Sequence, residues 1–187
     1  MAWNRYCLGY HGGEDASIRK IVNFEQAMRP SRNRYDWLGN GFYFWEDSPL
    51  RALAWARKKH GSSAGVLGAV IDLGNCLDLL QSESIEFVRE AYLALSILME
   101  EEGGRLPENV GANFFARNLD CAVFEFLHQS RKRQRREEFD TVRGFFIEGK
   151  EIYPTAGIRE HDHIQVCVRN KKSILGYFLP PEIYGAS

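Results

Sequence analysis

Hydrophobic and polar positions along the chain follow two different periods. Short apolar or alternating runs bounded by glycine or polar turns are typical of strands, and they lie at 5–10, 42–44, 66–73, 142–147, 164–169 and 173–178. Apolar residues three and four positions apart predict helices, and these lie around 18–25, 84–101 and 119–131. Strands and helices are therefore both expected.

A further helix is predicted between Ser48 and Gly61. Ser48 is a favoured N-cap, Pro49 suits the first helical position, and Gly61 suits the position after the last turn. The basic residues 57–60 lie near the negative end of the helix dipole. The inner face of this helix is expected to consist of Leu50, Leu53, Ala54 and Trp55 or a neighbour.

The strand at 164–169 alternates, so Ile164, Val166 and Val168 should lie on one face and Gln165 on the other. With 187 residues, of which 44% are hydrophobic, the chain has enough material for one core. We therefore expect a single domain over 1–187, with a helical insertion at about 82–132.

Charge and cysteine usage exclude several classes of protein. The formal net charge is −1, so any nucleic-acid binding would have to depend on a local basic patch. The four cysteines are scattered, which argues against a disulfide framework or a zinc ribbon. The chain begins with no secretory signal pattern and contains no apolar run of about 20 residues, so we expect a cytoplasmic protein that does not enter the membrane.

Three segments suggest nucleotide chemistry when taken in chain order. The first is Tyr10-His11-Gly12-Gly13, where we expect a strand to end and where the two glycines permit a turn or a close backbone approach. The second is Gly39-Asn40-Gly41-Phe42-Tyr43-Phe44 before the capped helix, and the third is the strand that bears Gln165. Together they resemble the His-Tyr-Glu pattern of ADP-ribosyltransferases of the diphtheria-toxin and poly(ADP-ribose) polymerase type. The third position departs from that pattern, because it holds glutamine where the family usually has glutamate.

The resemblance implies an α+β fold, a split β-sandwich in which a pair of packed sheets forms an NAD-binding cleft. His11 would bind ribose hydroxyls, while the backbone at Gly12 and Gly13 would approach the nicotinamide carboxamide. Tyr43 would stack on the nicotinamide ring. Two arginines of the basic loop are candidates for the pyrophosphate, namely Arg32 and Arg34.

The glutamine changes the expected reaction. Gln165 can accept a hydrogen bond from the ribose but cannot take a proton, so we expect transfer of single ADP-ribose units. His163 lies two residues earlier on the same strand face, which makes it a candidate for orienting or deprotonating the acceptor. Glu148 and Glu151, on the segment that leads into this strand, are alternative candidates.

The predicted function is mono-ADP-ribosyl transfer from NAD to a macromolecule, which could be protein, DNA or RNA. Small stand-alone domains of this kind resemble bacterial toxins or anti-phage effectors, for which a neutralising antitoxin protein is a possible partner. The alternatives are an NAD glycohydrolase and a non-catalytic module that binds nucleotides or nucleic acid.

Two other charged clusters have competing interpretations. A basic run forms either a nucleic-acid contact or a solvated helix end, and it consists of Arg131, Lys132, Arg133, Arg135 and Arg136. His161 and His163 could both ligate a metal ion, but no third ligand is fixed by spacing, so we predict no metal.

Overall fold

The structure, a computed structural model, describes residues 5–111 and 115–185. In these residues seven strands form one sheet in the order β4-β7-β8-β2-β1-β3-β9. Neighbouring strands are antiparallel except for the parallel pair β4–β7. The strands are β1 (Tyr6–Glu14), β2 (Phe42–Glu46), β3 (Ala64–Asp72), β4 (Cys76–Asp78), β7 (Thr141–Phe146), β8 (His163–Val168) and β9 (Ile174–Phe178). The expected α+β class is confirmed at this level.

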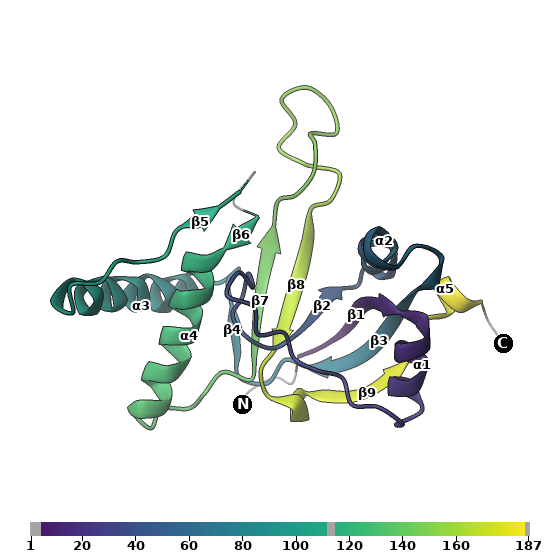
Figure 1. The fold of residues 1–187 in the computed structure, drawn as a ribbon, viewed down its shortest axis with the longest axis horizontal. Helices are drawn as coiled ribbons and strands as arrows, with labels where there is room; N and C mark the ends of the chain where they lie inside the picture. The colour runs from purple at the N-terminus through teal and green to yellow at the C-terminus, as the bar shows by residue number, and fades with distance from the viewer. Residues whose placement is uncertain (1–4, 112–114, 186–187) are drawn as a thin grey trace.

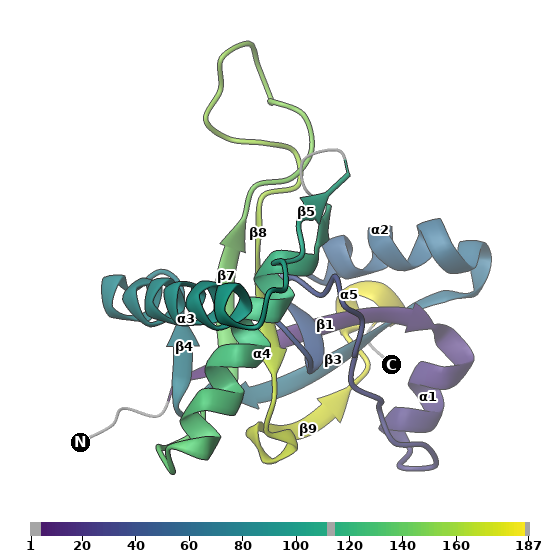
Figure 2. The ribbon, with the colours of Figure 1, turned by 60° about the vertical axis from the view of Figure 1, so that its left-hand side comes forward.

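The helices lie at the two ends of this sheet, as Figures 1 and 2 show. Near β1, β3 and β9 are α1 (Asp15–Val22), α2 (Pro49–His60) and α5 (Pro181–Tyr184). At the other end α3 (Ser82–Glu101) and α4 (Asn118–Arg133) pack against each other. A short ribbon, β5 (Asn109–Val110) and β6 (Ala116–Arg117), lies between α3 and α4 in the chain. Gly61–Ser63 and Lys171–Ser173 form 3₁₀ turns.

The two long helices of the segment 82–133 begin and end within two residues of the positions expected for them. Among the described residues, no helix combines the length and the apolar composition that a membrane span requires.

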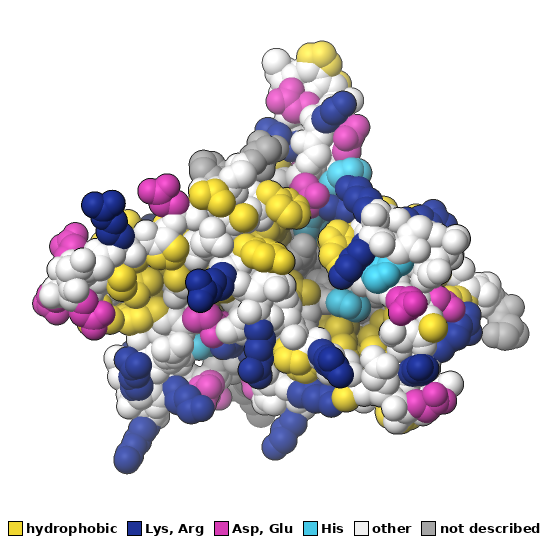
Figure 3. All heavy atoms as spheres, in the orientation of Figure 1, with side chains coloured by type: hydrophobic (Ala, Val, Ile, Leu, Met, Phe, Trp, Pro, Cys, Tyr) yellow, Lys and Arg dark blue, Asp and Glu magenta, His cyan; other side chains and the backbone are white. Residues whose placement is uncertain are grey.

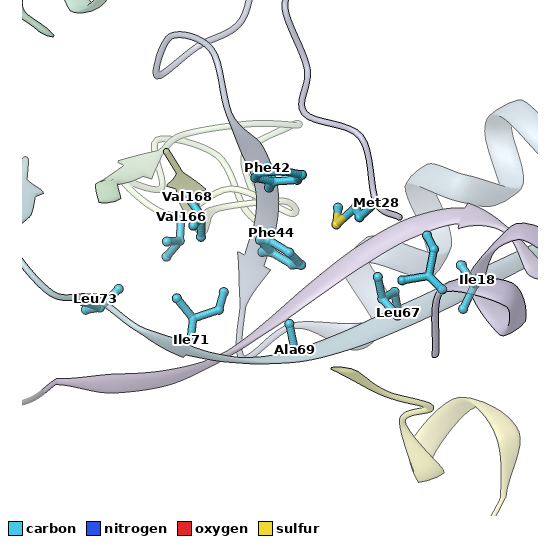
Figure 4. Close-up of a cluster of buried hydrophobic side chains, with 11 residues drawn as sticks. Ile18, Met28, Phe42, Phe44, Leu67, Ala69, Ile71, Leu73, Val166 and Val168 are labelled. Atoms are coloured by element: carbon cyan, nitrogen blue, oxygen red, sulfur yellow. The ribbon is translucent and has the colours of Figure 1, made fainter. Parts of the chain in front are cut away.

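The sheet opens between β1 and β2. These strands pair only at Gly9–Glu46 and Tyr10–Trp45, although β1 continues along β3 to Glu14 and β2 pairs with β8 from Phe42. Phe44 of β2 and Val166 of β8 belong to the same buried cluster as Ile71 of β3 (Figure 4). The expected pair of packed sheets is therefore one hydrogen-bonded sheet whose two halves fold over a shared core.

The expected end of the first strand at His11–Gly13 was wrong, since β1 runs through this segment to Glu14. Of the two roles that the glycines permit, the structure shows the close backbone approach, at Gly12, and not the turn. A Cβ atom at Gly12 would lie 2.2 Å from the carbonyl oxygen of Ala52 and 3.0 Å from Cβ of Ala56. The glycine is needed because α2 lies directly on β1.

This close packing also selects the buried face of α2. That face consists of Ala52, Leu53 and Ala56, whereas Leu50 is 68% exposed. The predicted start of the helix at Pro49 is confirmed, but the Ser48 side chain makes no capping hydrogen bond. Small side chains face β1 because larger ones would keep the helix too far from the strand.

Candidate active site

A cavity of about 450 Å³ lies where β1 and β2 diverge, a volume suited to a small-molecule ligand. In Figure 3 histidine side chains lie in and beside a hollow near the centre of the face shown. The residues that line the cavity come from β1 (His11–Gly13), the loop 31–37, β2 (Tyr43–Trp45), α2, Phe115, Glu148 and Gln165 of β8. The structure thus brings together the three segments singled out in the sequence.

His11 connects the two diverging strands. Its Nδ1 lies 2.9 Å from the carbonyl oxygen of Tyr43, and burial of the ring lowers the pKa of His11 below its ordinary value. The neutral ring carries one proton, which must be on Nδ1 because a carbonyl can only accept. Nε2 therefore has a lone pair that can accept a hydrogen bond from a ligand hydroxyl.

The backbone beside His11 lies on an open edge of β1. Beyond Tyr10, β1 has a strand partner only on its β3 side among the described residues. Alternate residues of a strand direct their N–H and C=O groups to opposite sides, so part of the 11–13 backbone is directed to the edge next to the cavity. A Cβ atom at Gly13 would meet nothing closer than 3.6 Å.

Tyr43 presents its ring to the cavity, but its hydroxyl is already engaged. The hydroxyl donates to the carbonyl oxygen of Gly39 at 2.6 Å and accepts from the backbone N–H of Leu38 at 2.9 Å. Burial raises the pKa of Tyr43. Phe42 and Phe44 point into the core on the other side of the strand (Figure 4), as the alternation predicts. The ring face, and not the hydroxyl, is thus available to a ligand.

Gln165 is held by His163. The amide Nε2 of Gln165 lies 3.0 Å from Nε2 of His163, whose Nδ1 lies 2.6 Å from the carbonyl oxygen of His161. A neutral His163 donates a hydrogen bond through Nδ1 and accepts one from the amide of Gln165. Oε1 of Gln165 then has no donor within the part of the chain that the structure describes. Burial lowers the pKa of His163, in keeping with the neutral form.

This geometry argues against His163 as the general base. Both of its ring nitrogens are engaged, its side chain is 2% exposed, and it does not line the cavity. His163 is instead a positioning residue for Gln165. Its pairing with the His161 backbone also removes Nδ1 from metal ligation, and the described residues contain no group of three or more His, Cys, Asp or Glu side chains that could hold a metal ion.

The two candidate glutamates on the segment after β7 differ in position. Glu148 lines the cavity, and its Oε2 lies 2.6 Å from Nη2 of Arg51 and 3.9 Å from Nδ1 of His163. Glu151 is exposed and accepts a hydrogen bond from the backbone N–H of Thr155 outside the cavity. Only Glu148 is therefore placed to act there.

Arg32 and Arg34 do not line this cavity. Both are exposed. Arg32 lines neighbouring cavities of about 680 and 570 Å³, and Arg34 lines the second of these. The loop residues that line the site are Ser31, Asn33, Tyr35, Asp36 and Trp37.

The cations in the lining belong to α2 instead, and sequence reasoning missed them. They are Arg51 and Lys59. A spacing of four residues in Arg51, Trp55 and Lys59 places all three on one side of the helix, which is the signal that could have found them.

The basic run lies at and beyond the end of α4, outside the cavity lining. Arg131 is engaged structurally: its Nε donates to the carbonyl oxygen of Glu137 at 2.8 Å, and its guanidinium lies 4.2 Å from the ring centre of Phe139. The four other basic residues are exposed, and they are Lys132, Arg133, Arg135 and Arg136.

Comparison of this chain with protein-family models, with curated proteins and with solved structures finds no match. The function must therefore be argued from the geometry of the site.

Proposed function

We propose that this protein is a mono-ADP-ribosyltransferase that uses NAD. The observation that supports the proposal is the cavity between β1 and β2, which His11, Gly12, Gly13, Tyr43 and Gln165 all line. The resemblance assigns NAD binding to the first four of these residues and a catalytic role on the ribose to Gln165. The opening in the sheet and the two halves over one core are also features expected of a split β-sandwich.

Each part of NAD has a chemically suitable partner in the cavity. Nε2 of His11 accepts from a ribose hydroxyl, and the ring of Tyr43 stacks on nicotinamide, which contributes roughly 0.5–1.5 kcal/mol beyond burial of area. The open backbone edge of β1 binds the carboxamide. Arg51 and Lys59, in place of the loop arginines, bind the pyrophosphate.

Gln165 then acts on the ribose. Cleavage of the bond between C1′ and the nicotinamide nitrogen builds positive charge on the sugar, while nicotinamide leaves as a neutral molecule. Oε1 of Gln165 accepts a hydrogen bond from the 2′-hydroxyl and so orients the sugar. Oε1 is available for this bond because the amide nitrogen of Gln165 is paired with His163. A neutral amide stabilises the developing charge less than a carboxylate, which favours transfer of single units.

The test uses NAD labelled in its adenosine half, with separate protein, DNA and RNA pools. The wild-type protein should release nicotinamide and label one pool, whereas His11→Ala and Tyr43→Ala should reduce release by about 100-fold. Tyr92→Ala, an exposed tyrosine on α3 outside the cavity lining, is the matched control and should retain activity.

Three outcomes are informative. Nicotinamide release without label in any pool would identify an NAD glycohydrolase instead of a transferase. Absence of release would leave a binding module and refute catalysis. Release that both variants retain would place the chemistry outside this cavity.

A further inference from the structure

We propose that Glu148 accepts the proton of the attacking group of the acceptor, and that Arg51 holds its carboxylate at the cavity. This inference depends on the transferase activity proposed above. It supplies the group that the triad of His11, Tyr43 and Gln165 lacks.

Among the residues that line the cavity, two have carboxylates, and only Glu148 is available. Asp36 is buried and accepts from the backbone N–H and the side-chain amide of Asn33, one bond to each carboxylate oxygen. The side chain of Glu148 is 28% exposed, and its Oε2 forms an ion pair with Arg51. Within residues 5–111 and 115–185 no donor lies at its Oε1, which leaves that oxygen free to accept a proton.

Arg51 is arranged to hold both Glu148 and the donor substrate. Its side chain is 9% exposed, and Nη2 lies 2.6 Å from Glu148. Its Nε is buried and has no acceptor among the described residues, although an unpaired buried donor is costly. A pyrophosphate oxygen of NAD is the acceptor that would pair it. Binding of NAD would then fix the guanidinium that positions Glu148.

The stem of the β7–β8 loop fixes the backbone of Glu148. The backbone N–H of Glu148 donates to Oδ1 of Asp162 at 3.1 Å, and the backbone N–H of His161 donates to the carbonyl oxygen of Glu148 at 3.0 Å. Glu148 lies two residues after β7 ends at Phe146, and the loop beyond it projects away from the sheet (Figure 1). The carboxylate is thus held at the base of the loop.

The reaction balances with Glu148 as the proton acceptor. The bond between C1′ and the nicotinamide nitrogen breaks, and its electron pair leaves with nicotinamide. A hydroxyl oxygen of the acceptor forms the new bond to C1′, and its proton passes to the carboxylate of Glu148 and then to solvent. Neither Gln165 nor the doubly engaged His163 can take this proton.

The test compares Glu148→Gln with Glu151→Gln, a matched change three residues along the same loop. Transfer by Glu148→Gln should fall about 100-fold or more in kcat, the usual contribution of a general base, while the Kd for NAD should change less than about threefold. Glu148→Asp keeps a carboxylate on a shorter side chain, so its kcat should be at least about tenfold higher than that of Glu148→Gln. Glu151→Gln should resemble the wild type in both measurements.

The outcomes separate this inference from the proposed function. If wild-type protein neither releases nicotinamide nor labels a pool, the transferase itself is refuted. If wild type transfers ADP-ribose and Glu148→Gln transfers it within about threefold of wild type, only the role of Glu148 is refuted. A parallel loss of NAD binding and transfer, with the fold retained by circular dichroism, would make Glu148 a binding residue and would also overturn the inference.

Discussion

Gly12 and Gly13 are adjacent glycines in β1, yet an added methyl group should have opposite effects at the two positions. At Gly12 the new Cβ would lie 2.2 Å from the backbone oxygen of Ala52, whereas C···O contacts are ordinarily about 3.3 Å or longer. Helix α2 would have to move by about 1 Å. Overpacking costs about 1–3 kcal/mol, and an obstacle made of backbone places Gly12→Ala near the upper end of that range.

At Gly13 the nearest atom would be 3.6 Å away, an ordinary contact. Neither glycine has a positive φ angle, so alanine fits the backbone and restricts the unfolded chain. Gly13→Ala should therefore stabilise the protein by about 0.4–1 kcal/mol. The two variants should differ by about 3–4 kcal/mol in free energy of unfolding.

Guanidinium denaturation followed by circular dichroism measures the difference in free energy of unfolding between the two variants, and thermal denaturation measures their melting temperatures. For a chain of this size, each 1 kcal/mol shifts the melting temperature by about 2–4 °C, so Gly12→Ala should melt roughly 6–12 °C below the wild type. Gly12→Ala should also weaken NAD binding, since the displaced helix provides Arg51, Trp55 and Lys59. Equal stability of the two variants within about 0.5 kcal/mol would refute the packing argument.

Three further changes test other contacts. Tyr43→Phe removes the hydroxyl bonded to Gly39 and Leu38, so it should lower the free energy of unfolding by about 1–3 kcal/mol while nicotinamide release persists; loss of release without loss of stability would contradict this. Burial lowers the pKa of His128 to about 3 from its ordinary 6.5, so its contribution to stability is present above pH 6.5 and is lost as the pH falls toward 3. The free energy of unfolding should therefore fall between pH 7 and pH 3 by roughly 4–5 kcal/mol less in His128→Phe than in the wild type, as measured by denaturation at each pH. An unchanged pH dependence would refute the lowered pKa of His128. Neutralising the four exposed basic residues at 132–136, with Arg131 retained, should weaken single-stranded nucleic-acid binding about tenfold or more at low salt, whereas unchanged affinity would exclude this surface.

Local signals predicted the longer helices and strands but not the short elements β4, β5, β6 and α5, while packing between elements decided the rest. Pro49 and Gly61 marked the ends of α2 correctly. Of the residues predicted for the buried face of that helix, only Leu53 is buried. Ala52 and Ala56 were missed, because they face β1 on account of the glycine opposite them. Two adjacent glycines such as Gly12 and Gly13 occur both where a chain turns and where another element packs closely against the backbone. The sequence therefore did not show that β1 continues straight through them.

The site shows the same limit. Alternation along regular strands placed Tyr43 and Gln165 at the cavity. Arg32 and Arg34 lie in an irregular loop, which has no regular repeat of inward and outward side chains. The sequence therefore did not indicate where their side chains point. For the same reason nothing in the sequence distinguished Glu148 from Glu151. The pairing of Arg51 with Glu148 joins α2 to the β7–β8 loop, a contact that only the folded chain defines.

The hydrogen bond between His11 and the carbonyl oxygen of Tyr43 joins β1 to β2 where the two strands diverge. One imidazole nitrogen is used by the scaffold, and the proposed function assigns the other to the ribose. If that assignment holds, a change that spreads β1 from β2 would move the ligand contact as well. The affinity for NAD would then depend on the separation of the two halves of the sheet.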